Sequence, residues 1–205
     1  PVRRSPAAGF AAYKKQYHQP AKTNSLVGLM TLLAARLDSR LNDDGEIVLL
    51  ADQDRRKWNA ELIRIGLHYL NLAAEGDEVS TYHLEAAIVA EHSMAKTFQE
   101  TNWKHIVTLY DHLARIKPSP AVYLNRAVAL SKINGFEAAI NAINKIDGIG
   151  KLVQTQYLFP AVLGEMYAHS GNRAKAEYYF KIAVGLTTSA QEKKLIGKKM
   201  MLPNQ

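Results

Sequence analysis

Cysteine is absent from the 205-residue chain, and its absence removes several kinds of chemistry at once. Disulfide scaffolds, thiolate zinc sites, iron–sulfur clusters and cysteine nucleophiles all require thiols. Long apolar runs are also missing. The longest, Leu26 to Ala35, is interrupted by Gly28 and Thr31, whereas about 20 apolar residues are needed to cross a bilayer. We therefore expect no membrane span, and no apolar stretch follows the first residues as it would in a secretory signal.

The signature motifs of common catalytic sites do not occur either. The sequence has no G-x-S-x-G elbow, no G-x-x-x-x-G-K phosphate loop and no G-x-G-x-x-G dinucleotide loop. Its seven histidines form no HExxH pair, and His105 and His112 would lie about 10 Å apart along a helix. A calcium loop at Asn42–Gly45 fails because its first and last ligand positions would be Arg40 and Ala51. We predict no metal, no cofactor and no catalytic residue, and hence no enzyme.

Positive charge is concentrated at the two ends of the chain. Residues 1–22 carry five basic residues and no acid, residues 191–205 sum to +3, and the remaining residues sum to −1. A nucleic-acid reader normally carries its charge on the folded body. The basic ends are therefore interpreted as solvated termini, or as ends that touch an acidic partner or nucleic acid. Residues 1–22 are predicted to be a separate basic segment, either poorly ordered or a remnant of a preceding region.

Helical spacing of apolar residues runs through nearly all of the remaining chain and predicts an all-α fold. Only Glu46–Leu50, after the turn-like residues 42–45, could be extended. Glycines, prolines and polar caps divide the rest into helices with short loops. The expected helices cover residues 24–40, 53–74, 81–97, 102–116, 120–133, 136–146, 155–170, 173–186 and 189–200.

An internal repeat organises the second part of the chain. Residues 157–188 follow the 34-residue tetratricopeptide (TPR) pattern, in which small residues let two helices cross closely and large residues fill the gap beside them. Seven positions match: Leu163, Gly164, Tyr167, Gly171, Ala176, Phe180 and Ala183. A second repeat precedes it, and a degenerate one lies before that. We predict a single domain over residues 23–205, a TPR-like stack of antiparallel helix pairs (α-solenoid) with residues 23–80 as capping helices and 81–200 as repeats.

Two groups of polar residues are candidate partner-binding sites. Asp52, Asp54 and Arg55 precede a predicted helix, either as an acidic first turn with Asp52 as the N-cap or as a functional patch. The second group lines the predicted groove of the repeats: Asn125, Val128, Lys132, Glu165 and His169.

Arg126 lies in the same predicted groove and also has two interpretations. It could form a buried ion pair with Asp111, or it could bind a ligand. We favour the buried pair, and removal of Arg126 would then leave an unpaired charge in the interior.

Several strings occur in the order typical of one family. They are Glu46–Arg55 with Trp58, Tyr82–Ile88, Thr101–Trp103, Leu109–Asp111 and Pro118–Ala129. Together they resemble the C-terminal extension of a group of extracytoplasmic-function (ECF) RNA polymerase sigma factors that ends in a TPR-containing domain. The resemblance covers about residues 24–200. The two sigma regions that would come before this extension do not fit into residues 1–23.

The resemblance implies a regulatory module of bacterial transcription initiation in the cytoplasm. Its partner would be the protein's own sigma-factor N-terminal regions, RNA polymerase or a signalling protein, with DNA reached only through the missing regions and no membrane involved. Two alternatives are a small helical hydrolase using Glu85, Glu91 and His92, and a DNA-binding module using the basic ends. A deep pocket with converging titratable groups would favour the first, and a strongly salt-dependent affinity for duplex DNA the second.

Overall fold

The computed structural model describes residues 20–201, which form ten α-helices and two short 3-10 helices. The α-helices are α2 (Pro20–Ala34), α3 (Ala60–Ala73), α4 (Thr81–Met94), α5 (Trp103–Ile116), α6 (Pro120–Asn134), α7 (Phe136–Asn144), α8 (Ile149–Thr155), α9 (Leu158–His169), α10 (Arg173–Leu186) and α11 (Ala190–Met201). The 3-10 helices are η1 (Leu37–Ser39) and η2 (Arg55–Lys57). Residues 20–201 contain no strand, only an isolated bridge between Leu41 and Ile47, and the predicted all-α fold is confirmed.

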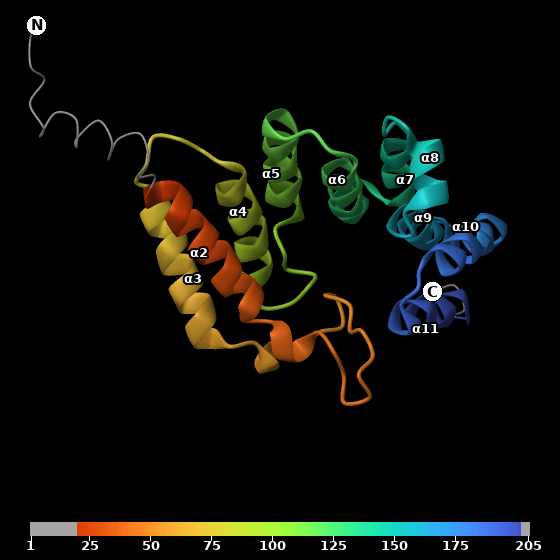
Figure 1. The fold of residues 1–205 in the computed structure, drawn as a ribbon, viewed down its shortest axis with the longest axis horizontal. Coiled ribbons are helices and arrows are strands. Elements are labelled where there is room, and N and C mark those ends of the chain that lie inside the picture. Colours follow the sequence, from red (N-terminus) through yellow and green to blue (C-terminus); the bar gives the residue numbers. More distant parts are fainter. Residues whose placement is uncertain (1–19, 202–205) are drawn as a thin grey trace, which may run out of the picture.

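The helices form a curved stack in which each one packs mainly against its neighbours. The largest contacts join α2 to α3 and α4, α5 to α6, α6 to α7, and α9 to α10. Figure 1 shows α2 and α3 at one end of the stack and α10 and α11 at the other. This arrangement confirms the predicted helical solenoid. None of these helices has the length and apolar character that a membrane span requires.

Small residues set the close crossings, as the repeat pattern predicts. A Cβ atom at Gly164 of α9 would lie 2.6 Å from the ring of Phe180 on α10. The first hairpin uses the same device, because a Cβ atom at Gly66 of α3 would lie 2.7 Å from Cγ of Leu32 on α2. Both contacts let two helix backbones approach more closely than a larger residue would allow.

Several predicted helices are shorter in the structure, and the first two are also divided. The helix predicted over residues 24–40 begins at Pro20 and ends at Ala34, and η1 follows after a turn. The helix predicted over residues 53–74 is divided into η2 and α3. Asn59 is the reason for the division: its side-chain oxygen accepts a hydrogen bond from the Leu62 N–H at 3.0 Å and starts a new helix.

Residues 149–155 form a helix, α8, where the glycines at 148 and 150 favoured a loop. Gly148 has φ of +71° and ends the preceding turn, so that α8 starts directly after it. Of the predicted basic segment, residues 1–19 lie outside the described part of the chain, and residues 20–22 belong to α2.

Candidate functional site

The charged segment before α3 divides into outward and inward side chains. Asp52 is exposed. Asp54 caps η2, because its carboxylate accepts a hydrogen bond from the Arg56 N–H at 3.0 Å and pairs with the Arg56 guanidinium at 2.9 Å. The predicted N-cap at Asp52 is therefore wrong by two residues, since the 3-10 helix begins only at Arg55.

Gln53, between the two aspartates, holds the preceding loop in place. The hydroxyl of Ser39 donates to Oε1 of Gln53 at 3.2 Å, and Nε2 of Gln53 donates to the carbonyl of Val48 at 3.1 Å. Gln53 is not among the residues predicted for this segment, which are all charged. The contacts of Gln53 with Ser39 and Val48 depend on how the turn folds, and residue spacing in the sequence does not predict them.

Arg55 points inward and joins η2 to the end of α4. Its Nη1 donates to the carbonyls of His92 and Ala95, at 2.7 Å for the latter. Helix C-termini leave such carbonyls without an intrahelical partner, so Arg55 caps α4. The guanidinium also lies 4.6 Å from the centre of the Trp58 ring, and that of Arg36 lies 5.6 Å from it. We call Arg36, Arg55, Trp58 and His92 the arginine junction.

Burial and positive charge dominate the electrostatics of this junction. Burial, followed by the positive charges of Arg36 and Arg55, lowers the pKa of His92 to about 4. His92 is therefore neutral at pH 7. Burial lowers the pKa of Arg36 as well, and the neighbouring charges of Arg40 and Arg55 add to this effect.

The residues of the hydrolase alternative are engaged in separate contacts. Oε1 of Glu91 pairs with Nδ1 of His105 at 2.6 Å, and the His92 ring packs edge-on against Trp103 with ring centres 5.2 Å apart. Glu85 is half-buried on α4 and acts on Tyr110, whose pKa is raised to about 12 mainly by burial and secondarily by this carboxylate. No group of three or more His, Asp or Glu residues is placed to hold a metal ion within residues 20–201.

Lys132 and His169, two of the predicted groove residues, meet around one aromatic ring. Nζ of Lys132 lies 5.7 Å from the centre of the Phe136 ring, and the His169 ring stacks on Phe136 with centres 4.6 Å apart. Lys132 also lies 5.5 Å from the Phe98 ring, which packs edge-on against Trp103. We call Lys132, Phe136, His169 and Phe98 the ring row. Its cation and rings attract one another electrostatically, although both Lys132 and His169 are exposed.

The other predicted groove residues have different surroundings. Asn125 is exposed on α6, seven residues and therefore two helical turns before Lys132. Glu165 is half-buried on α9 and accepts a hydrogen bond from Nζ of Lys199 on α11, so its carboxylate already has a partner. Val128 is half-buried and packs against the apolar core. The two phenylalanines of the ring row were missed, because Phe98 lies in a loop and Phe136 at the start of a helix.

The predicted pair of Arg126 and Asp111 forms, but it lies at the surface. Nε of Arg126 donates to Oδ1 of Asp111 at 2.6 Å. The two side chains are 29% and 42% exposed, so the prediction of a buried pair is wrong. Water therefore solvates both charges when the pair is broken, which makes the pair far less important for stability than a buried one.

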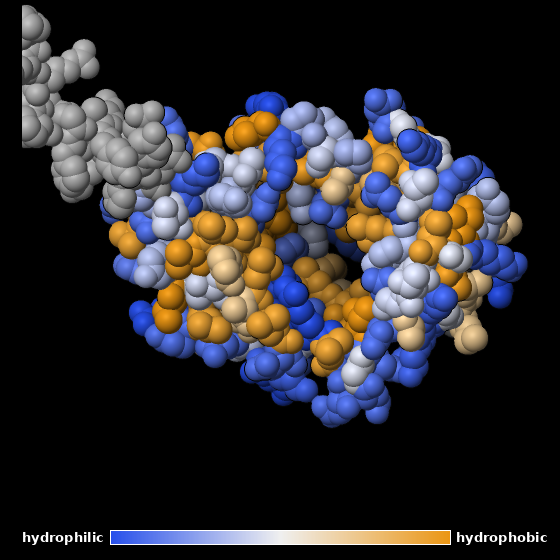
Figure 2. Space-filling view, viewed as in Figure 1, coloured by the Kyte–Doolittle hydropathy of each residue, from blue (hydrophilic) through white to orange (hydrophobic). Residues whose placement is uncertain are grey.

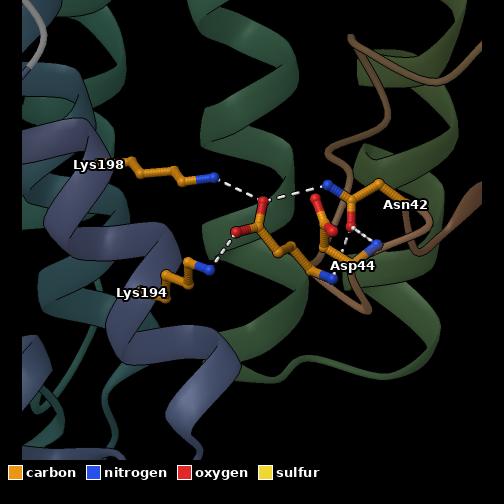
Figure 3. A network of polar contacts seen from close by, with 5 residues as sticks. Asn42, Asp44, Lys194 and Lys198 are labelled. Atoms are coloured by element: carbon orange, nitrogen blue, oxygen red, sulfur yellow. Dashed lines mark hydrogen bonds and ion pairs between the residues drawn. The ribbon is translucent and has the colours of Figure 1, made fainter.

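A polar clasp connects the loop after η1 to the last helix (Figure 3). The carboxylate of Glu46 receives the ammonium groups of Lys194 and Lys198 from α11. The Asn42 side chain completes the loop, donating from Nδ2 to Glu46 and accepting at Oδ1 from the N–H groups of Asp44 and Glu46. The hydrogen bond from Lys194, followed by those from Lys198 and Asn42, lowers the pKa of Glu46 to about 2. We call Glu46, Lys194 and Lys198 the clasp.

The clasp brings together residues as far as 152 positions apart in the sequence. Figure 2 shows the molecule hollowed at its centre, between the helices that begin the stack and those that end it. The loop and α11 lie next to each other on the lower side of this view. The described stack is thus bridged across its two ends, with the hollow between them.

Comparison with known proteins gives two matches. A model described as a family of unknown function (DUF6596) matches residues 8–74, which include α2 and α3. The chain is 35% identical over 167 residues to an uncharacterized protein of Rhizobium meliloti (strain 1021). That match covers 82% of this chain and 39% of the relative, so the chain spans about two fifths of the relative's length. No solved structure matches it.

Proposed function

We propose that the chain is a non-catalytic regulatory and protein-interaction domain of an ECF-type RNA polymerase sigma factor. The observation that carries this proposal is a curved stack of helix pairs with exposed polar residues, formed by a sequence that resembles the TPR-containing sigma extension. Asn125, Lys132 and His169 are exposed on α6 and α9, the first helices of two successive repeats. Helical arrays of this kind bind partners along the surface that such helices form.

The partner we propose is the protein's own pair of sigma regions, with RNA polymerase or a signalling protein as further candidates. The length of the Rhizobium relative supports this choice, because 39% of that protein is matched and the rest leaves room for other regions. We also propose that the repeats are TPR repeats. The close approach of Gly164 to Phe180 supports this, since it joins the small and large positions of the TPR pattern.

Contacts at the end of the chain weigh against direct DNA binding. Lys194 and Lys198 pair with Glu46, and Lys199 pairs with Glu165. Three of the four lysines of residues 191–205 therefore have an acidic partner within the described chain. Ion pairs of this kind reduce the charge that a DNA phosphate backbone would meet.

A transcription reporter tests the proposal in the intact sigma factor. The full-length protein is compared with a version truncated before Thr23 and with the single variants Asp52→Lys, Asn125→Ala and Lys132→Ala. We expect the truncation and at least Lys132→Ala to change sigma-dependent transcription while the melting temperature of the Lys132→Ala domain is unchanged. Lys181→Ala is the matched control, because Lys181 is also an exposed helical lysine but pairs with Glu177 on α10. Unchanged transcription after truncation would refute the proposal.

A further inference from the structure

The arginine junction contains buried hydrogen-bonding atoms that the described chain does not use. Four of its side-chain nitrogens are closed to water and lack a hydrogen-bond partner: Nε of Arg36, Nη2 of Arg55, Nε1 of Trp58 and Nδ1 of His92. Within residues 20–201 the same holds for only one other buried side-chain atom, Oγ1 of Thr101. Buried polar groups in native proteins nearly always have partners. Four such groups at one corner of the fold therefore point to a ligand.

The positive charge of the junction indicates that the ligand is negatively charged. None of the ion pairs formed within residues 20–201 includes Arg36 or Arg55. Burial lowers the pKa of Arg55, and Glu100 counteracts this from a distance without pairing with it. Asp54, which is adjacent to Arg55 in the sequence, forms an ion pair with Arg56 instead. Two guanidinium groups without a carboxylate partner favour an anion.

The segments outside the described structure offer no acidic side chain for this role. Residues 1–19 and 202–205 contain neither aspartate nor glutamate. An acidic side chain for this site would therefore come from a different molecule or from a region beyond these 205 residues.

We propose that the arginine junction is a docking site for a carboxylate side chain, an aspartate or glutamate, of a partner protein. A carboxylate is planar and accepts hydrogen bonds from guanidinium groups in a fixed geometry. Nη1 of Arg55 already serves the end of α4, which leaves Nη2 of Arg55, Nε of Arg36 and the indole N–H of Trp58 as donors. These nitrogens can only donate hydrogen bonds and carboxylate oxygens can only accept them, so the two groups are complementary. The inference concerns the chemistry of this site and does not depend on the partner's being a sigma region.

If the junction is a binding site, removing one of its arginines, Arg36, should not lower the melting temperature of the free chain. The charge of Arg36 is repelled by Arg40 and Arg55 and forms no ion pair in the described chain. Removing the guanidinium but keeping an apolar stem, as in Arg36→Met, should therefore leave the melting temperature unchanged or raise it. A residue present only to hold the fold together would show the opposite effect.

Anion-dependent melting of the 205-residue chain tests the proposal, with acetate as the carboxylate probe and chloride at equal ionic strength as the reference. We expect acetate at several times its dissociation constant to raise the wild-type melting temperature by about 2–4 °C over chloride. Arg36→Met should lose this difference. Arg64→Met is the matched control and should keep it, because Arg64 is exposed on α3 and pairs with Glu61. The imidazole NMR signal of His92 should move with acetate in the control and not in Arg36→Met.

Arg36→Lys provides a second variant in case Arg36→Met does not fold. It keeps the positive charge but has no Nε–H donor, so less than half of the acetate response should remain. Three results would overturn the proposal: a wild-type protein that melts alike in acetate and chloride, an Arg36 variant with the full acetate response, or a larger response to phosphate than to acetate. The last would assign the site to a phosphate group.

Discussion

The first half of the stack contains buried polar atoms without hydrogen-bond partners, whereas the second half is built around a large apolar core. All buried side-chain nitrogen and oxygen atoms found without a partner in residues 20–201 belong to residues 36–101, around η2, α4 and the start of α5. The largest core cluster runs from Leu124 to Ile196 and consists of apolar side chains from α6 to α11. Polar caps close its helices, as Ser119 does for α6 and Asn172 for α10.

The two halves should therefore differ in rigidity and in their response to a bound partner. A core of apolar side chains around close helix crossings is rigid and resists changes in volume. A corner with unpaired buried donors is less stable by itself and gains from a partner. The first half of the stack therefore holds the arginine junction, and the second half supplies the rigid core that carries the exposed Asn125, Lys132 and His169.

Replacing Gly164 by leucine should give the largest loss of stability and tests the rigid half. The added side chain would meet the buried Phe180 ring, with its Cβ atom already within 2.6 Å, and we expect a loss of roughly 1–3 kcal/mol. Urea unfolding measures this. Gly185→Leu is the matched control, since a Cβ atom there meets nothing within 4 Å. Equal stabilities of the two variants would contradict the proposed helix crossing.

Acid should destabilise the first half through His92, by about 2 kcal/mol between pH 7 and pH 5. The pKa of His92 is lowered from 6.5 to about 4 in the folded chain. Between these values the unfolded chain binds a proton that the folded chain does not, so stability falls as pH falls. Urea unfolding of wild type and His92→Gln at both pH values isolates the effect. The variant should lose less stability than wild type, and parallel losses would show that His92 is not buried as described.

Breaking the surface pair of Arg126 should have a small effect, about 0–1 kcal/mol. Both side chains are partly exposed, so neither charge is left in the interior. A double-mutant cycle with Arg126→Ala and Asp111→Ala measures the coupling. A coupling of several kcal/mol would mean that the pair is buried in solution.

Opening the clasp should change shape more than stability. Glu46→Gln removes the charge that holds Lys194 and Lys198, and the loop should move away from α11. Because the chain has no cysteine, spin labels at Asp43→Cys and Lys193→Cys attach only there, and the label distance should lengthen in the variant. Acid should lengthen it in wild type, because the advantage of the closed clasp is lost as the pH falls from 4.5, the ordinary pKa of Glu46, toward about 2, its pKa in the clasp. Glu61→Gln is the control, and an unchanged distance in Glu46→Gln would disprove the bridge.

The fold could be predicted largely from the sequence, because helix positions depend on local spacing and on cap residues. The crossing of α9 and α10 was found from Gly164 and Phe180, which are 16 residues apart in one repeat. The break before α3 was not found. It depends on Asn59, and apolar spacing on both sides of Asn59 suits one continuous helix.

The candidate sites were found only in part, because their members come from distant segments. Lys132 and His169 were selected by repeat position, but Phe136, which joins them, gives no signal in the sequence. Arg55 was selected as a charge, whereas its burial depends on the end of α4, 37 and 40 residues later. Asp52 and Asn125 remain predictions.

The clasp also has a consequence for synthesis on the ribosome. The loop with Glu46 emerges first, and Lys198 follows 152 residues later, which takes roughly 8–30 s at 5–20 residues per second. The helices in between form from local contacts and can fold as they emerge. Glu46 cannot form these ion pairs during that interval. The clasp can therefore form only after the nascent chain has been elongated through α11.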